Sequence, residues 1–272
     1  MDILSIQSAV VHGVVGNNAA MPVLQSFGWQ PLALHTAWYS HHKGHAGWFG
    51  ETTPLPLFEQ FLRYALQAGH LQVTTVLSGY LGSAQHAELL ARHLPTQMRY
   101  VCDPVMGDVD GQYVSNELVQ AYRTLLVPRA TVLLPNIFEL GLLVGQSISS
   151  PTAACAAAHQ LLSRNPGLQV VVVTGIPAAG VLQSLAVSRE RVARTQHAYI
   201  PYRVSGTGDV FSATWLGLYL RTNDPAISLT YAAQFVYHLV QRTARAQQRE
   251  LQLAAELSWL QQTLQSIPTP DP

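Results

Sequence analysis

A short segment in the last third of the chain combines glycines with a carboxylate. Residues 205–209 read Ser-Gly-Thr-Gly-Asp and precede an apolar run, Val210–Leu220, that is typical of a helix. Backbone N–H groups that converge at a glycine-rich helix N-terminus favour an anion, for example a phosphoryl group. Asp209 would stand beside that anion, where it could accept a proton from an attacking alcohol. The competing interpretation is an Asp that only stabilises its helix.

Two further acidic segments follow short apolar runs. Asp103 and Asp108 come after the run 99–102, and Glu139 comes after the run 131–134. Carboxylates at strand ends are hard oxygen ligands, suited to magnesium that carries nucleotide phosphates. The alternatives are a solvated Asp-Pro turn and, because Asn136 precedes Glu139 by three residues, a helix capping box.

Residues 38–56 are rich in Gly, His, Trp and Pro and fit no regular pattern. A connection of that length is more often functional than idle, so we expect a binding loop there. Its three histidines, His41, His42 and His45, could gather on one transition metal. They lack a Cys or carboxylate at ligand spacing, however, and an ordinary polar loop is the favoured interpretation.

The elements that must position these residues alternate along the chain. Short β-branched apolar runs are separated by amphipathic stretches, which indicates an α/β fold with a parallel sheet covered by helices. Active sites in such sheets lie at the carboxyl ends of the strands, so the acidic segments are expected to meet there. The predicted strands are 3–7, 31–36, 73–78, 99–102, 131–134 and 169–174, followed by a hairpin of 181–187 and 193–200.

Length and composition limit the class of protein. We expect one domain over residues 1–272, because one large α/β domain accommodates this length. The 15 Lys and Arg residues balance 15 Asp and Glu residues, so no basic face predicts nucleic acid as a partner. Cys102 and Cys155 are far apart, which argues against a zinc site or a disulfide framework. The sequence also has no apolar run of membrane-spanning length, and we expect a cytoplasmic protein without a membrane partner.

Taken together, the motifs make the chain similar to the pyridoxal kinases of the ribokinase-like superfamily over nearly its whole length. This resemblance implies a ribokinase-like α/β fold, with a central, mostly parallel sheet flanked by helices on both faces. The residues that carry it are Ile6-Gln7-Ser8, Gly16-Asn17, Ser78-Gly79-Tyr80, Val101–Asp108, Pro135-Asn136 with Glu139, Thr174, Gly206–Asp209 and Leu239–Thr243.

The resemblance also implies a role for each segment. Asp209 would be the general base, and the amides of Gly206, Thr207 and Gly208 would hold the γ-phosphoryl group of ATP. The segment from about 188 to 205 would cover the nucleotide and exclude water during transfer. The implied substrate contacts are Ser8, His42, Lys43, Tyr80 and Asp209; the Mg²⁺ ligands are Asp103, Asp108 and Glu139; the ATP contacts are Asp103, Asn136, Glu139, Thr174, Arg194, His197, Gly206 and Gly208.

Two positions depart from the family pattern. Many relatives have Asn-His-Thr over the substrate, whereas this chain has His41-His42-Lys43, so a cation replaces a hydroxyl. Lys43 could bind the ring oxygens or form a Schiff base with the aldehyde, or it could be an exposed loop lysine. Some relatives have a Thr before Pro-Asn that serves a monovalent cation, and Leu134 stands there instead. A requirement for potassium or sodium therefore does not carry over.

The resemblance predicts an ATP-dependent kinase that phosphorylates the 5′-hydroxyl of pyridoxal, giving pyridoxal 5′-phosphate in vitamin B6 salvage. The nearest alternative is a kinase for hydroxymethylpyrimidine or another small ring alcohol, since the same anion site serves many acceptors. A binding protein that holds pyridoxal or its phosphate without turnover is the alternative from another class. Relatives of this family are homodimers, which makes a homodimer the expected assembly.

Overall fold

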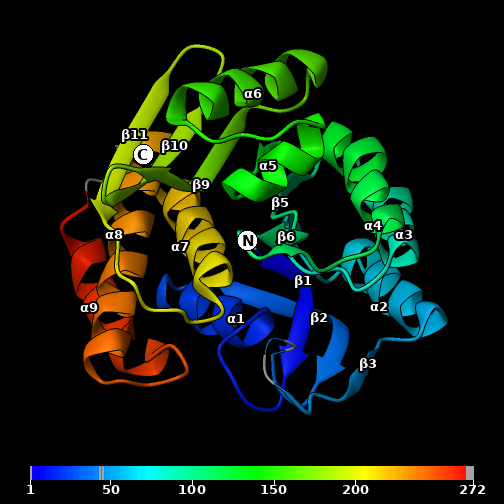
Figure 1. The fold of residues 1–272 in the computed structure, drawn as a ribbon. Coiled ribbons are helices and arrows are strands. Elements are labelled where there is room, and N and C mark those ends of the chain that lie inside the picture. The colour runs from blue at the N-terminus through cyan, green and yellow to red at the C-terminus, as the bar shows by residue number, and fades with distance from the viewer. Residues whose placement is uncertain (1, 43, 45, 268–272) are drawn as a thin grey trace.

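The computed structural model describes residues 2–42, 44 and 46–267. A nine-stranded sheet runs through this part of the chain in the order β11-β10-β9-β8-β5-β4-β1-β2-β3 (Figure 1). Its strands are β1 (Asp2–Val10), β2 (Gln30–Tyr39), β3 (Gly50–Thr52), β4 (Val73–Ser78), β5 (Arg99–Cys102), β8 (Val132–Leu133), β9 (Val170–Ala178), β10 (Val181–Val187) and β11 (Val192–Ala198). The short strands β6 (Gly107–Asp108) and β7 (Gly111–Gln112) pair separately.

Helices cover both faces of the sheet (Figure 1). One face carries α2 (Leu55–Gln67), α3 (Ala84–His93), α4 (Asn116–Ala121), α5 (Ile137–Val144) and α6 (Pro151–Arg164). The other carries α1 (Asn17–Ser26), α7 (Thr207–Thr222), α8 (Pro225–Arg245) and α9 (Leu253–Gln265). A π-helical turn (Tyr122–Leu126) and a 3-10 turn (Val127–Arg129) continue α4. Within the described residues, no helix is both long and apolar enough to cross a membrane.

The two helix layers explain why the central strands are apolar on both sides. Successive side chains of a strand point to opposite faces of the sheet. In β5, Tyr100 and Cys102 pack in the core under α2–α6, whereas Val101 packs in the core under α1 and α7–α9. Strands buried on both faces read as continuous hydrophobic runs, and this is the signal that predicted them.

The order of the strands locates the crevice that a ligand can use. The chain passes from β1 to β2 on one side and then returns to β4 on the other side of β1, and all these pairs are parallel. Such a reversal opens a crevice at the carboxyl ends of the strands on either side of it. The segments that follow β1 and β4, which contain Gly16 and Tyr80, therefore begin beside this crevice.

The predicted sheet is confirmed, with one correction in residues 38–56. β2 continues to Tyr39, and Gly50–Thr52 forms β3, which pairs antiparallel with Ala37–Tyr39. Aromatic side chains favour an extended strand at Trp38 and Tyr39. Gly50 has a φ of 139°, and a Cβ there would lie 2.0 Å from the carbonyl oxygen of Trp38. A glycine is thus required for this close pairing, and the irregular part of the connection is shorter than expected.

Candidate functional site

The glycine turn before α7 is shaped by its contact with the loop that follows β1. Gly206 has a φ of 88°, and a Cβ there would lie 1.8 Å from the carbonyl oxygen of Val14. A Cβ on Gly208, by contrast, would meet no atom within 4 Å. Among the residues that the structure describes, no side chain caps the N-terminus of α7, whereas Ser83 caps α3 and Ser115 caps α4. The turn therefore combines open space with backbone N–H groups that no capping side chain occupies, which suits an anion.

Asp209 lies in the first turn of α7, next to the end of β1. Burial raises the pKa of its carboxyl group from 3.8 to about 6, although a hydrogen bond from the backbone N–H of Gly16 opposes the rise. A Cβ on Gly16 would lie 2.9 Å from Ser8 Oγ, so the hydroxyl of Ser8 borders the same place. The structure thus brings Ser8, Gly16 and Asp209 together, and a carboxylate of this pKa is poised to accept a proton near neutral pH.

A second acidic group, Asp103, is buried after β5 and belongs to the same region. Its Oδ2 accepts a hydrogen bond of 2.5 Å from Ser212 Oγ, one turn beyond Asp209 on α7. Burial raises the pKa of Asp103 well above its ordinary value, and the charges of Glu139 and Asp209 raise it further. The Asp103 carboxyl group is therefore repelled by two other carboxyl groups around the end of β5. A cation brought by a ligand would relieve this repulsion.

Glu139 and Asn136 form the capping box that their spacing predicts. Asn136 Oδ1 accepts from the backbone N–H of Glu139 at 2.9 Å, and Glu139 Oε2 accepts from that of Asn136 at 2.9 Å. Glu139 Oε1 accepts from the N–H of Met106 at 3.0 Å. Both oxygens of the Glu139 carboxylate thus have backbone donors, and this side chain joins α5 to the segment that follows Asp103.

The three predicted metal ligands do not converge on one point. Asp108 is exposed in β6, and its Oδ1 accepts from the N–H of Asp110 at 2.8 Å. Within the described ranges, no three His, Cys, Asp or Glu side chains form a group that could hold a metal ion. Asp103, Asp108 and Glu139 therefore do not form a complete set of protein ligands for a metal ion. Mg²⁺ does not need such a set, because it keeps several waters and takes substrate phosphates as ligands.

Tyr80 follows β4 and belongs to an aromatic cluster that sequence reasoning missed. Its ring centroid lies 6.4 Å from that of Tyr39, which in turn packs edge-on against Trp48 at 5.7 Å. Thr36 Oγ1 donates to the carbonyl oxygen of Tyr80 at 2.6 Å and fixes the backbone there. A cavity of about 400 Å³ borders Tyr80 and also contacts Tyr113. The cluster supplies flat apolar faces next to polar atoms, as a site for a small aromatic ring requires.

The loop after β2 reaches the glycine turn through His42. His42 Nδ1 lies 3.1 Å from Ser205 Oγ, directly before Gly206. The ring of His41 contacts Ser40 Oγ at 3.1 Å and the carbonyl oxygen of Ala46 at 3.3 Å. Lys43 and His45 lie outside the described residues, so their predicted roles have no structural counterpart here.

The two predicted contacts on β11 point in different directions. Arg194 and His197 are three residues apart in a strand, so they leave opposite faces of the sheet. His197 stacks on Tyr237 of α8 with ring centroids 5.0 Å apart, and burial lowers the pKa of its imidazole. Arg194 is exposed. Thr174 in β9 lies next to Asn136, to which it is joined by an isolated bridge.

Other residues of the site were not predicted, although one left a trace in the sequence. Ser212 follows Asp209 by three residues, a spacing that puts two side chains on the same side of a helix. Tyr39 and Trp48 meet only because β3 folds back on β2, and no local pattern announces that contact.

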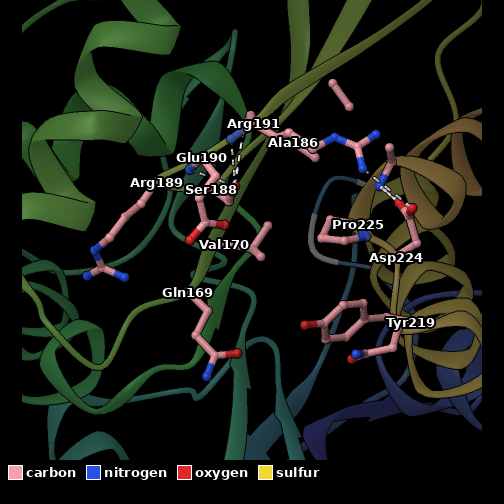
Figure 2. A pocket seen from close by; sticks show the side chains of 13 residues that line it. Gln169, Val170, Ala186, Ser188, Arg189, Glu190, Arg191, Tyr219, Asp224 and Pro225 are labelled. Atoms are coloured by element: carbon pink, nitrogen blue, oxygen red, sulfur yellow. Dashed lines mark hydrogen bonds and ion pairs between the residues drawn. The ribbon is translucent and has the colours of Figure 1, made fainter.

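A second cavity of about 400 Å³ lies at the other edge of the sheet (Figure 2). It is bounded by the start of β9, the β10–β11 turn and the α7–α8 loop. Three of its charged side chains, Arg189, Arg191 and Asp224, have partners within the protein. Arg189 donates to the carbonyl oxygen of Leu168 at 2.8 Å and to that of Leu162 at 2.9 Å, and Arg191 lies 3.7 Å from Asp224. Figure 2 shows Arg191 directed toward Asp224 and Arg189 directed away from it. Asp224 thus has a cationic neighbour, whereas the hydrogen-bond donors to Asp103 and Asp209 are the Ser212 hydroxyl and the Gly16 N–H.

Comparison with known proteins connects this arrangement to one group of kinases. Residues 51–253 match the family described as phosphomethylpyrimidine kinase. The chain is 36% identical to the pyridoxal kinase PdxY of Deinococcus radiodurans, with 93% of this chain and 91% of that protein covered. It is 40% identical to the pyridoxine/pyridoxal/pyridoxamine kinase of Bordetella avium, covering 78% of this chain and 75% of that protein. Among solved structures, it resembles a pyridoxal kinase from Leishmania donovani in complex with ADP and pyridoxine, with a TM-score of 0.86 at 28% identity and coverage of 96% and 95%.

Proposed function

The chain belongs to the phosphomethylpyrimidine kinase family, and we propose that it transfers the γ-phosphoryl group of ATP to the 5′-hydroxyl of pyridoxal. The products are ADP and pyridoxal 5′-phosphate. The choice of a B6 vitamer over a pyrimidine is supported by the relatives from Deinococcus radiodurans and Bordetella avium, which are named for pyridoxal and its analogues.

One observation carries this proposal: a helix N-terminus without a side-chain cap has a carboxyl group of raised pKa in its first turn. The amides of Gly206, Thr207 and Gly208 would stabilise the negative charge of the γ-phosphoryl group. As the oxygen of the 5′-hydroxyl bonds to phosphorus, Asp209 would take the proton of that hydroxyl. The bond between that phosphorus and the bridging oxygen of ATP breaks, and ADP leaves with the electron pair.

The pyridine ring would bind between the end of β1 and the aromatic cluster. We assign Ser8 to a hydrogen bond with the ring substituents and Tyr80 to the ring face. His42 would border the acceptor, because its contact with Ser205 holds it next to the glycine turn. Lys43 follows His42 directly, and a contact of its ammonium group with the ring oxygens or the aldehyde stays part of the proposal.

The nucleotide would lie over Asn136, Thr174 and β11. Arg194 and His197 leave opposite faces of β11, so we propose only the exposed Arg194 as the outer contact, because His197 is stacked on Tyr237. The carboxyl groups at the end of β5 suit magnesium, because they offer hard oxygen donors and their mutual repulsion has no cationic partner in the contacts described above. Asp103 would hold the ion, with Asp108 and Glu139 acting through water. When bound, the ion would supply charge neutralisation on the phosphates.

A coupled assay of ADP release with a panel of ring alcohols tests the proposal. Pyridoxal, pyridoxine, pyridoxamine and hydroxymethylpyrimidine are each supplied with ATP and Mg²⁺, and the products are identified by mass. We expect pyridoxal 5′-phosphate to form. Turnover of the pyrimidine alone would assign the chain to the other substrate class, and ligand binding without any product would leave a binding protein. Light scattering on the same sample tests the expected homodimer.

A further inference from the structure

The segment between α8 and α9 reaches back to the first loop of the chain. We call residues 246–252 the α8–α9 loop and residues 11–16 the β1–α1 loop. Glu250 Oε2 accepts a hydrogen bond of 3.3 Å from the backbone N–H of Val14. The same oxygen lies 3.1 Å from the position that a Cβ on Gly13 would occupy, so a side chain at residue 13 would crowd the carboxylate. A side chain near the C-terminus thus fixes a backbone segment near the N-terminus.

The β1–α1 loop in turn packs against the glycine turn before α7. The carbonyl oxygen of Val14, the residue held by Glu250, packs against Gly206 so closely that no Cβ fits between them. Two residues further on, the N–H of Gly16 donates to the Asp209 carboxylate. A shift of this loop would move both the anion-binding turn and the hydrogen-bond donor that orients Asp209.

The α8–α9 loop, which carries Glu250, is anchored through Gln252 by a buried hydroxyl of α8. Thr243 is fully buried; its Oγ1 donates to the carbonyl oxygen of Leu239 at 2.8 Å and accepts the backbone N–H of Gln252 at 3.2 Å. The side-chain amide of Gln252 then donates to the carbonyl oxygen of Glu250 at 3.2 Å. These contacts give a structural reason for the segment Leu239–Thr243, whose contribution the catalytic residues alone leave unexplained.

We propose that Glu250 is a positioning residue for phosphoryl transfer, which holds the β1–α1 loop so that Gly16 and Gly206 keep their places around Asp209. This inference rests on the proposed function, because it assigns Asp209 the role of base. Glu250 acts through the backbone of Val14 and need not touch either substrate. Its loss should therefore impair the transfer step more than the binding of pyridoxal.

Paired substitutions separate the hydrogen bond from the charge. Glu250→Ala removes the acceptor, whereas Glu250→Gln keeps an oxygen that can accept the N–H of Val14. Arg249→Ala, at an exposed position of the same loop, is the matched control. The free energy that a hydrogen bond to a charged group contributes corresponds to a factor of about ten to a hundred. We therefore expect kcat of the alanine variant to fall by about tenfold to a hundredfold. We expect the KM for pyridoxal to change less than kcat, and the glutamine variant to recover most of the activity.

A second measurement tests the positioning without any turnover. Amide resonances of Val14 and Gly16, followed by NMR in each variant, should shift in Glu250→Ala and stay near their wild-type positions in Glu250→Gln and Arg249→Ala. If the wild-type protein phosphorylates no ring alcohol, the proposed function fails, while these resonances still report on the loop. An alanine variant with unchanged kcat and unchanged resonances would overturn the inference. A glutamine variant as impaired as the alanine variant would also overturn it, because charge rather than the hydrogen bond would then matter.

Discussion

Cavities lie at both ends of the strands, but the charged side chains at the two ends have different kinds of partner. At the carboxyl ends of the strands, burial raises the pKa of Asp103 and of Asp209, and their hydrogen-bond donors are the uncharged Ser212 hydroxyl and Gly16 N–H. At the opposite edge, Arg189 donates to backbone carbonyls and Asp224 caps α8 while lying near Arg191 (Figure 2).

This difference shows that a cavity alone does not identify an active site. A charged group whose partners are already in the protein contributes to the fold, whereas buried like charges cost stability that only a ligand can recover. The acids at the carboxyl edge are therefore maintained at a cost to the folded state, and the following predictions test that distinction.

Two aspartates at helix N-termini provide the sharpest test. Asp209→Asn keeps the shape of the side chain and removes its basicity, so kcat should fall by about 10²- to 10⁴-fold, the span typical of a lost general base. Asp224→Ala at the other edge should leave kcat unchanged and lower the free energy of unfolding by about 0.5 to 2 kcal/mol, the effect of losing a cap. Steady-state kinetics and chemical denaturation of both variants give the comparison. Equal activity of wild type and Asp209→Asn would reduce Asp209 to a helix-stabilising residue.

The two glycines of the turn should respond to alanine in different ways. Gly206→Ala places a Cβ against the Val14 carbonyl at a positive φ, so the turn must deform, with a loss of more than about 2 kcal/mol of unfolding free energy and of most activity. Gly208→Ala meets open space and should keep full stability, because alanine is favoured over glycine in a helix. Its methyl group would intrude where the γ-phosphoryl group is proposed to bind, raising the KM for ATP. An unchanged KM in this second variant would argue against that location of the phosphoryl group.

The cost of keeping Asp209 buried should appear as a dependence of stability on pH. Its folded pKa of about 6 exceeds its ordinary value of 3.8, so the folded state binds more protons between these values and stability falls as pH rises through them. At pH 8, Asp209→Asn should therefore unfold at a higher denaturant concentration than wild type, because its free energy of unfolding is larger by about 1 to 3 kcal/mol. Below about pH 4 the two proteins should not differ. Asp110, whose pKa is lowered by the hydrogen bond from Arg203, is the control of opposite sign. An Asp209→Asn variant less stable than wild type at pH 8 would contradict this account.

Arg189→Ala should have the smallest effect on catalysis. The guanidinium group donates to carbonyl groups beyond the C-terminal end of α6 and within its last turn, so its removal leaves partly buried acceptors unpaired. We expect a loss of about 1 to 3 kcal/mol of unfolding free energy and an unchanged kcat. Thermal unfolding and initial rates measured on the same preparation decide the matter. A large fall in kcat with intact stability would connect the second cavity to catalysis.

Much of the fold could be predicted because the local signals agree with the tertiary structure. Strands such as β4 are buried on both faces, and their uninterrupted apolar runs give their positions directly. The capping box of Asn136 and Glu139 was visible from spacing alone and is confirmed. The resemblance to pyridoxal kinases, which rested chiefly on Gly206–Asp209 and the strand-end acids, is confirmed by the family match and by relatives that cover most of the chain.

Contacts between distant segments set the limit of such prediction. Glu250 and Val14 meet only after α8 has packed on α7 and α9 has packed beside α1, and no periodicity links the two residues. The sequence predicts a loop at β3, because a strand of three residues carries too little strand signal of its own. The same limit applies to Arg194 and His197. The resemblance of the chain to a family does not reveal that these two side chains leave opposite faces of β11.

The contact between Gly206 and Val14 also bears on the order of events during synthesis. β1 and the β1–α1 loop emerge from the ribosome before α7, and the contact with Gly206 cannot form until the start of α7 has been synthesised and has docked. A nascent or truncated chain that ends before α7 carries Ser8 and Asp103 without the turn or Asp209. Phosphoryl transfer would then be confined to molecules in which the β1–α1 loop and α7 have come together, so that activity reports on the docking of these two segments.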